Sequence, residues 1–235
     1  MTRIDHPNRP DELAVANQVL QEVWGADTPI LPLEMLVAIA HSGGYVAVAW
    51  HDDRPVGASV ALLAVHDGRP ALHSHITGLL PDARATGLGR ALKLHQRDWA
   101  RKRGIERIVW TFDPLVRRNA WFNLAVLGAD VVAYLPSFYG AMTDAINAGD
   151  DSDRLLVSWR VEAPLPDEPR TGADRPPDAL LVPTPDDVVA LRRHDRAAVA
   201  TWRASTRTAL TTALDEGRSV LGFTRDGHYV LGSTP

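Results

Sequence analysis

The chain contains no cysteine, and its 29 acidic and 25 basic residues leave a formal net charge of only −4. The absence of cysteine excludes disulfides, thiolate metal ligands and a cysteine nucleophile, and it suits a cytoplasmic location. No apolar run is long enough to span a bilayer, so no membrane partner is expected. The slightly acidic balance gives no reason to expect nucleic acid as a partner. The N-terminal 25 residues have helical patterning with acidic residues, unlike a signal peptide.

Two common signatures of nucleotide binding are incomplete in the stretch of residues 76–104. Here an apolar strand enters a turn that holds Gly87 and Gly89, and the turn opens directly into an amphipathic helix. The dinucleotide fingerprint needs a third glycine where Leu92 stands, and no Gly-Lys-Ser/Thr sequence follows. Helix N-termini present unpaired backbone N–H groups and a positive dipole end. The stretch therefore predicts a phosphate cradle; the alternative is an exposed turn with two incidental glycines.

The run RATGLG at residues 84–89, preceded by LLP at 79–81, resembles the pyrophosphate loop of the GCN5-related N-acetyltransferase (GNAT) superfamily. In that family, backbone amides of the loop bind the pyrophosphate of an acyl-CoA. The resemblance implies acetyl-CoA or another acyl-CoA as co-substrate. The cofactor-binding residues it implies are Leu79, Arg84, Ala85, Thr86, Gly87, Leu88, Gly89, Arg90, Asn119 and Phe122. Lys93, Arg117 and Arg118 are further basic candidates to meet the phosphates.

The apolar periodicity predicts an α/β chain. The GNAT resemblance implies that its strands form an α+β mixed sheet. Helices are expected over residues 11–24, 33–41, 88–103 and 117–127, and strands over 45–51, 56–66, 71–79, 106–112, 131–134 and 155–161. This order is similar to that of the GNAT acyl-CoA N-acyltransferase fold, in which the mixed sheet is splayed near its middle and carries helices on both faces. Residues 1–161 are accordingly predicted to form the acyltransferase domain.

The remaining third of the chain is predicted to be an extension. Seven prolines within residues 162–185 indicate an extended connector without regular structure. Thr184, with Pro185 next to it and an acid three residues on, predicts the start of a helix. Asp226-Gly227 predicts a β-hairpin behind that helix. Residues 186–235 hold too little apolar surface to fold alone, so they should pack on the body or on a second subunit.

His73 and His75 are the candidate proton acceptors. They stand two apart on a predicted strand, so both side chains should project from one face. An ammonium must lose its proton before it attacks a thioester, and histidine titrates in the range for that task. His73 falls where many GNAT histone acetyltransferases place a glutamate base, and the pair resembles the His-x-His of arylalkylamine N-acetyltransferases. The alternative is a structural pair; a metal site lacks an evident third ligand.

The GNAT resemblance also implies roles for three backbone or side-chain groups. The N–H of Leu79, where the family's strand breaks, would donate to the thioester oxygen as an oxyanion hole. Asn119 would contact the pantetheine arm. Many members carry a general-acid tyrosine late in the following helix, where this chain has Val126 and Leu127. Tyr139, with Tyr134 as the second candidate, is the predicted substitute.

The expected function is transfer of an acetyl or other short acyl group, succinyl included, from CoA to the primary amine of a small molecule such as an amino acid. The expected catalytic groups are His73, His75, Leu79 and Tyr139. No metal is required, and a homodimer is the expected assembly. The alternative function is a non-catalytic CoA-binding sensor, which the missing helix tyrosine favours.

Overall fold

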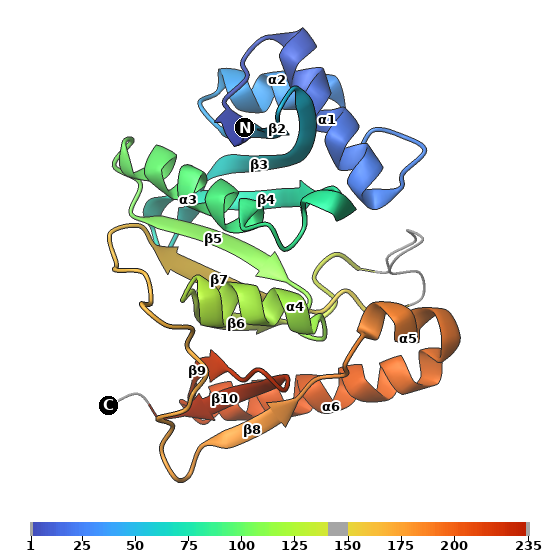
Figure 1. Cartoon of the computed structure of the whole chain (residues 1–235). Helices are drawn as coiled ribbons and strands as arrows, with labels where there is room; N and C mark the ends of the chain where they lie inside the picture. The colour runs from blue at the N-terminus through green and yellow to red at the C-terminus, as the bar shows by residue number, and fades with distance from the viewer. Residues whose placement is uncertain (1, 141–149, 234–235) are drawn as a thin grey trace. The chain divides into compact units, whose positions relative to one another are not determined.

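The computed structural model describes residues 2–140 and 150–233. The chain divides into two compact units, one formed by the residues up to Trp110 with 160–162, the other by residues 111–159 and 163–235. Seven strands form a mixed sheet in the order β1-β2-β3-β4-β5-β7-β6, and three more form an antiparallel sheet in the order β8-β10-β9 (Figure 1). The boundary between the units falls within β5 and at the end of β7.

The first unit follows the predicted order of elements closely. Its elements are β1 (Thr2–Asp5), α1 (Pro10–Trp24), α2 (Leu33–His41), β2 (Tyr45–His51), β3 (Arg54–His66), β4 (Arg69–Leu79), α3 (Leu88–Arg101) and β5 (Arg107–Phe112), which runs on into the second unit. Among the described residues of this unit, β1 and a short 3-10 helix (Pro81–Ala83) were not predicted. The 3-10 helix lies between β4 and α3, and β1 is at the start of the chain. Strand β1 pairs antiparallel with β2, and its four residues are too few to show a period of two.

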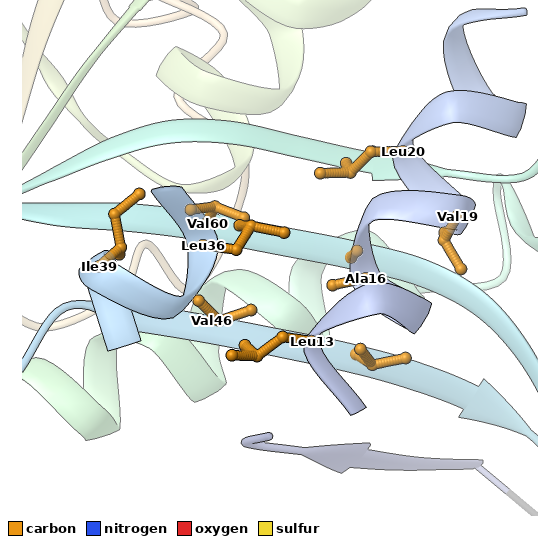
Figure 2. Packing of buried hydrophobic residues seen from close by; sticks show 10 residues of the cluster. Leu13, Ala16, Val19, Leu20, Leu36, Ile39, Val46 and Val60 are labelled. Carbon is orange, nitrogen blue, oxygen red and sulfur yellow. The ribbon is translucent and has the colours of Figure 1, made fainter. Parts of the chain in front are cut away.

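Helices cover both faces of this part of the sheet. On one face α1 and α2 bury Leu13, Leu20 and Leu36 against Val46 and Val60 of the strands, as Figure 2 shows. The apolar residues of α1 recur at helical spacing, so one stripe of the helix faces the strands. On the other face α3 hydrogen-bonds to β3 and β4 through side chains of its inner stripe. The mixed α/β sheet with helices on both faces is therefore as predicted.

Close packing of α1 fixes the end of β4. A Cβ atom at Gly78 would lie 2.5 Å from the Trp24 ring and 2.8 Å from a methyl of Val23. Since real Cβ atoms do not approach so closely, only glycine lets the last turn of α1 lie against the strand here. The segment of β4 that precedes the glycine-containing loop is thus held from one face by an apolar helix.

β4 and β5 are parallel neighbours but are in register at only two positions. Leu72 pairs with Ile108, and His73 pairs with Val109. Although β4 continues to Leu79 and β5 to Phe112, no further pair forms between them. The strands therefore part beyond His73, and this is the predicted splay near the middle of the sheet.

The second unit contains the remaining elements. They are α4 (Arg117–Ala120), a π-helical segment (Trp121–Val126), β6 (Asp130–Leu135), β7 (Arg154–Arg160), β8 (Leu180–Pro183), α5 (Val188–His194), α6 (Arg196–Asp215), β9 (Ser219–Phe223) and β10 (His228–Gly232). The predicted helix over 117–127 is present, but it widens from α to π geometry. The hairpin predicted at Asp226-Gly227 joins β9 to β10.

Two predictions for the C-terminal third were wrong. Thr184 does not cap a helix; its hydroxyl donates to the carbonyl of Gly227, and Asp187 instead caps α5 by accepting from the N–H of Ala190. The proline-rich segment is not irregular throughout, because residues 180–183 form strand β8 on the edge of the small sheet. An edge strand needs hydrogen bonds on one side only, so Pro183 is tolerated at its end.

Candidate active site

The loop before α3 leaves the N-terminus of that helix uncapped. Gly87 is the N-cap residue, and no side chain hydrogen-bonds to the first turn. The first intrahelical bond runs from Ala91 N–H to Gly87 O at 3.0 Å. The N–H groups of residues 88–90 therefore have no acceptor within the helix. Together with the helix dipole, these groups form a site that suits an anionic oxygen.

The two glycines of this loop serve different purposes. Gly87 has φ +86°, in the left-handed region that other residues enter at a cost, although a Cβ there would meet nothing within 4 Å. At Gly89 a Cβ would lie 3.4 Å from Cδ1 of Leu79, which is ordinary contact. Gly87 is thus needed for backbone conformation, and neither position places a side chain over the open N–H groups.

Arg84 links this loop to the end of β4. Its Nε donates to the carbonyl of Leu79 at 3.1 Å. The N–H of Leu80 donates to Val56 O of β3 at 2.9 Å. Because successive residues of an antiparallel strand face opposite edges, the N–H of Leu79 points away from β3, toward the side on which β5 has parted. Leu79 therefore offers a backbone donor beside the loop.

His73 and His75 lie close together on β4. Their ring centroids are 6.3 Å apart, and the planes are tilted by 35°. A register shift in the pairing with β3 leaves His75 without a directly opposed residue. Burial lowers the pKa of both imidazoles, and the pKa of His73 is lowered further by His75 and Lys93. Both rings are therefore predominantly neutral at pH 7 and can accept a proton.

The expectation that Lys93 meets phosphates was wrong. Its side chain is buried, with 4% exposure, and Nζ donates to Ser74 Oγ at 3.1 Å and to Gln96 Oε1 at 2.9 Å. Nζ also lies 3.8 Å from the centre of the Trp110 ring. Burial lowers the pKa of Lys93 to about 7. Lys93 follows Leu92 directly and stands three residues before Gln96, and both of these residues lie on the inner stripe of α3. This helical spacing was the sequence signal that Lys93 is buried.

The remaining predicted site residues lie in the second unit. Asn119 is in the first turn of α4, and Phe122 lies half-buried in the π-helical segment. Tyr139 is 46% exposed, with its hydroxyl 3.4 Å from Thr111 Oγ1. Tyr134 instead donates to Asp153 Oδ2 at 2.5 Å, and burial and this carboxylate raise its pKa. Tyr139 is therefore the tyrosine with an accessible hydroxyl.

Arg117 is held by the C-terminal third of the chain. It forms an ion pair with Asp186 and donates to the carbonyl of Thr184 at 2.6 Å. A Cβ at Gly227 would lie 2.0 Å from Nε of Arg117, so this glycine also makes room for the guanidinium. The expectation that Arg117 meets a phosphate was wrong for this reason.

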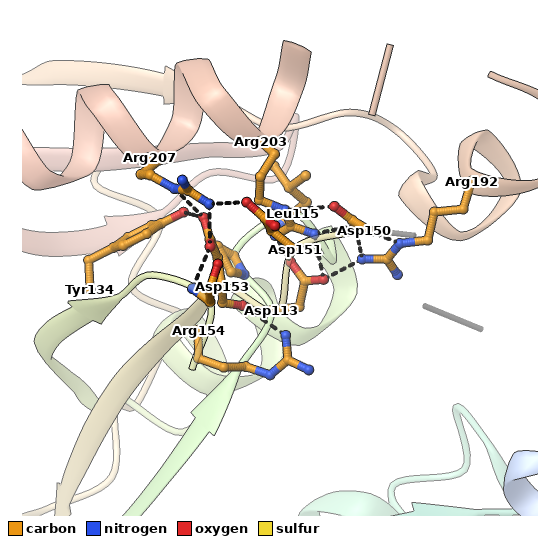
Figure 3. Close-up of polar contacts among 12 residues, drawn as sticks. Asp113, Leu115, Tyr134, Asp150, Asp151, Asp153, Arg154, Arg192, Arg203 and Arg207 are labelled. Atoms are coloured by element: carbon orange, nitrogen blue, oxygen red, sulfur yellow. Dashed lines mark hydrogen bonds and ion pairs between the residues drawn. The ribbon is translucent and has the colours of Figure 1, made fainter. Parts of the chain in front are cut away.

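A buried cluster of carboxylates and guanidinium groups also lies in the second unit, as Figure 3 shows. Asp113 and Asp150 both accept from Arg192 and from Arg203 of α6, whose exposure is only 3%. Arg207, one turn further along α6, donates to Asp153 at 2.6 Å. Each of these carboxylates has an arginine partner, so the cluster anchors α6 and leaves no obvious base for catalysis. Sequence reasoning missed it, although the four-residue spacing of the arginines and the acids at 150–153 were visible.

Residues 2–140 and 150–233 contain no group of three His, Cys, Asp or Glu side chains that could hold a metal ion. Within the same ranges, no helix is long and apolar enough to cross a membrane. Within the first unit, the candidate site consists of main-chain donors at the start of α3 and two neutral histidines on β4.

Comparison with known proteins bears on this site. A model of the acetyltransferase (GNAT) family matches residues 13–123, which include most of α1, the loop before α3 and the strand β4 with its two histidines. No curated protein sequence matches the chain.

The fold is similar to three solved structures. Ribosomal-protein-S18-alanine N-acetyltransferase from Escherichia coli has 16% identity and a TM-score of 0.54, over 70% of this chain and 96% of that one. YncA from Salmonella typhimurium, solved with its cofactor acetyl-CoA, has 16% identity and a TM-score of 0.52, over 69% and 95%. A GNAT-family acetyltransferase from Streptococcus pneumoniae has 15% identity and a TM-score of 0.51, over 68% and 99%. The predicted GNAT fold is confirmed.

Proposed function

We propose that the chain acetylates the primary amine of a small molecule such as an amino acid, because a model of the acetyltransferase (GNAT) family matches residues 13–123. The acyl-CoA-dependent acetyltransferase activity follows from the family. The class of acceptor, transfer of other short acyl groups such as succinyl, and the roles of individual residues form the proposal.

The uncapped N-terminus of α3 is the observation that carries the proposal. Acetyl-CoA supplies an activated acetyl thioester and a pyrophosphate by which it can be held. The free N–H groups of residues 88–90 and the left-handed backbone at Gly87 fit such a diphosphate. The N–H groups of Thr86 and Gly87 extend the row of donors. Arg84, tied to Leu79 O, keeps this loop next to the end of β4.

His73 or His75 takes the proton from the acceptor ammonium. Desolvation lowers the pKa of both imidazoles, so each is available as a free base at neutral pH. The two imidazole rings are close enough to contact the same acceptor amine or the same ordered water molecule. The acidic net charge of the chain favours approach of a cationic amine over an anionic acceptor.

Leu79 and Tyr139 are assigned the two remaining catalytic roles, those of oxyanion donor and general acid. The N–H of Leu79 points away from β3 and donates to the carbonyl oxygen that gains negative charge as the amine attacks. Tyr139, with its exposed hydroxyl, protonates the departing thiolate. Asn119 and Phe122 line the path of the pantetheine arm. No covalent bond to the protein is needed, which agrees with a chain that has no cysteine.

Release of free thiol tests this proposal. The full chain is incubated with acetyl-CoA or succinyl-CoA and a panel of amino acids, polyamines and arylalkylamines, and thiol is measured against amine-free controls. We expect amine-dependent release with at least one amino acid or other small primary amine. Tight CoA binding without amine-dependent release across the whole panel would contradict the proposal and favour the sensor alternative.

A further inference from the structure

The ammonium group of Lys93 lies where β4 and β5 part. The last register pair between these strands joins His73 to Val109. The next residue on each strand is Ser74 on β4 and Trp110 on β5, and Nζ of Lys93 contacts both, at 3.1 Å from Ser74 Oγ and 3.8 Å from the Trp110 ring centre. One side chain of α3 thus joins the two strands at the apex of their separation.

The fold does not need a charge at this position. Among the described residues, no carboxylate forms an ion pair with Lys93, and its partners are a hydroxyl, an amide and an aromatic face. A buried ammonium without a counter-charge loses hydration that such partners replace only in part. An unbranched apolar side chain of similar length would fill the same space at lower cost. Stability alone therefore does not explain the lysine.

The hydrogen bonds of Lys93 extend along the back of the histidine strand. Gln96, which accepts from Nζ, lies 3.4 Å from Ser59 Oγ, and Ser59 lies 2.7 Å from Thr77 Oγ1. This chain of polar groups therefore joins Ser74, which stands between the two histidines, to Thr77, two residues before Leu79. These hydrogen bonds hold the stretch of β4 on which the catalytic groups proposed for the first unit lie, namely His73, His75 and Leu79.

The charge of Lys93 also acts on His73. Burial lowers the pKa of His73 most, followed by the charges of His75 on the same strand and Lys93 on α3. The neighbouring strands place the apolar Leu62 and Val109 in register with His73, and α1 presents Val23 and Trp24 to β4. Because the pKa of Lys93 is about 7, Lys93 carries its proton in the more acidic range where His73 titrates.

We propose that Lys93 is a positioning residue for the histidine pair: from α3 it holds Ser74, which stands between His73 and His75, and the ring of Trp110 at the point where β4 and β5 part. This inference rests on the proposed function of the histidines as the base. It explains why an uncompensated charge is kept inside the unit, one helical turn beyond the loop that opens α3. It gives Lys93 no contact with substrate.

Histidine titration by NMR tests the inference without any turnover, so it is independent of whether the acetyl-transfer proposal holds. The His73 signal is identified by its loss in His73→Gln. We expect Lys93→Met to raise the pKa of His73, because removal of a nearby positive charge favours the imidazolium. Lys102→Met removes a charge from the exposed side of the same helix, where Lys102 pairs with Asp98, and should leave the His73 signal unchanged.

Two further measurements separate this role from a structural one. Lys93→Met should unfold at a temperature equal to or up to roughly 8 °C above that of the wild type, since a buried charge is removed. The acidic limb of its kcat/KM profile should move to higher pH, and Lys93→Arg, which keeps the charge, should restore the wild-type limb.

A His73 titration that is unchanged in Lys93→Met would overturn the inference. So would failure of both Lys93→Met and Lys93→Gln to fold, because a residue essential for folding needs no role at the histidines. The inference is also overturned if Lys93→Arg folds but shows the same pH profile of kcat/KM as Lys93→Met.

Discussion

Replacement of Gly87 by valine should abolish tight CoA binding while the fold survives. The residue has φ +86°, and a Cβ there would meet nothing within 4 Å, so valine has space but an unfavourable backbone. The left-handed conformation costs an L-residue about 1–2 kcal/mol, and β-branching adds to this. The loop can relieve the strain only by rotating the peptides on either side of residue 87. That rotation turns the first N–H groups of α3 away from the diphosphate.

The size of the effect follows from the bonds that are lost. A hydrogen bond to a charged group contributes about 1.5–3 kcal/mol, and 1.4 kcal/mol is a tenfold change in affinity. Loss of one or two amide–phosphate bonds therefore predicts an acetyl-CoA affinity lower by roughly 10-fold to 1,000-fold or more. The backbone strain should lower Tm by roughly 2–8 °C in a chain of this length. Titration calorimetry and thermal unfolding measure the two effects separately.

Gly104 provides the matched control. It follows the other end of α3, with φ +68° and no atom within 4 Å of a built Cβ. Gly104→Val should therefore cost similar stability but leave acetyl-CoA affinity unchanged, because the C-terminal end of the helix offers no free N–H groups. Wild-type affinity in Gly87→Val, or an equal loss in both variants, would refute the cradle at the start of α3.

Two other predictions concern proton transfer and the buried ion cluster. In the wild type, acetyl transfer should decline on the acid side of pH 6.5, because the pKa values of His73 and His75 are lowered from 6.5 by burial and protonation removes the base. If His73 or His75 is the base, the variant that lacks it, His73→Gln or His75→Gln, should be slower and should lose this acidic limb. A wild-type pH profile in both variants would exclude histidine as the base. Asp113→Ala should lower the free energy of unfolding by about 3–5 kcal/mol, because it leaves Arg203 buried with part of its charge uncompensated. Denaturant unfolding measures this, and Asp186→Ala, which removes an exposed partner of Arg117, should cost far less; equal losses would show that burial of the cluster contributes nothing.

The elements of the first unit follow from local patterns. The apolar, valine-rich runs of β2 and β3, the helical stripe of α1 and the glycines at its end and in the loop before α3 are each local in the sequence. The strand β1 was missed because four residues carry no clear period. Thr184 was misjudged because the capping pattern does not reveal that Gly227, 43 residues away, competes for its hydroxyl.

The side-chain environments depend on packing between distant segments. Lys93 is buried against Ser74 and Trp110, and Tyr134 donates its hydroxyl to Asp153. A sequence motif states which residue types are present, but not which of them lose contact with water. The pKa values that assign the base depend on that burial, so they could not be predicted from the spacing of the histidines.

Residue order and local spacing were sufficient for the succession of helices and strands and for the open N-terminus of α3, because periodicity and turn-forming glycines act over a few residues. The mixed sheet and its splay were expected only from the resemblance to the GNAT family. Only the tertiary structure decided that Lys93 is an internal ammonium and that the arginines of α6 pair with Asp113 and Asp150. The physical reason is that electrostatic energies depend on burial and on distances between segments far apart in the chain.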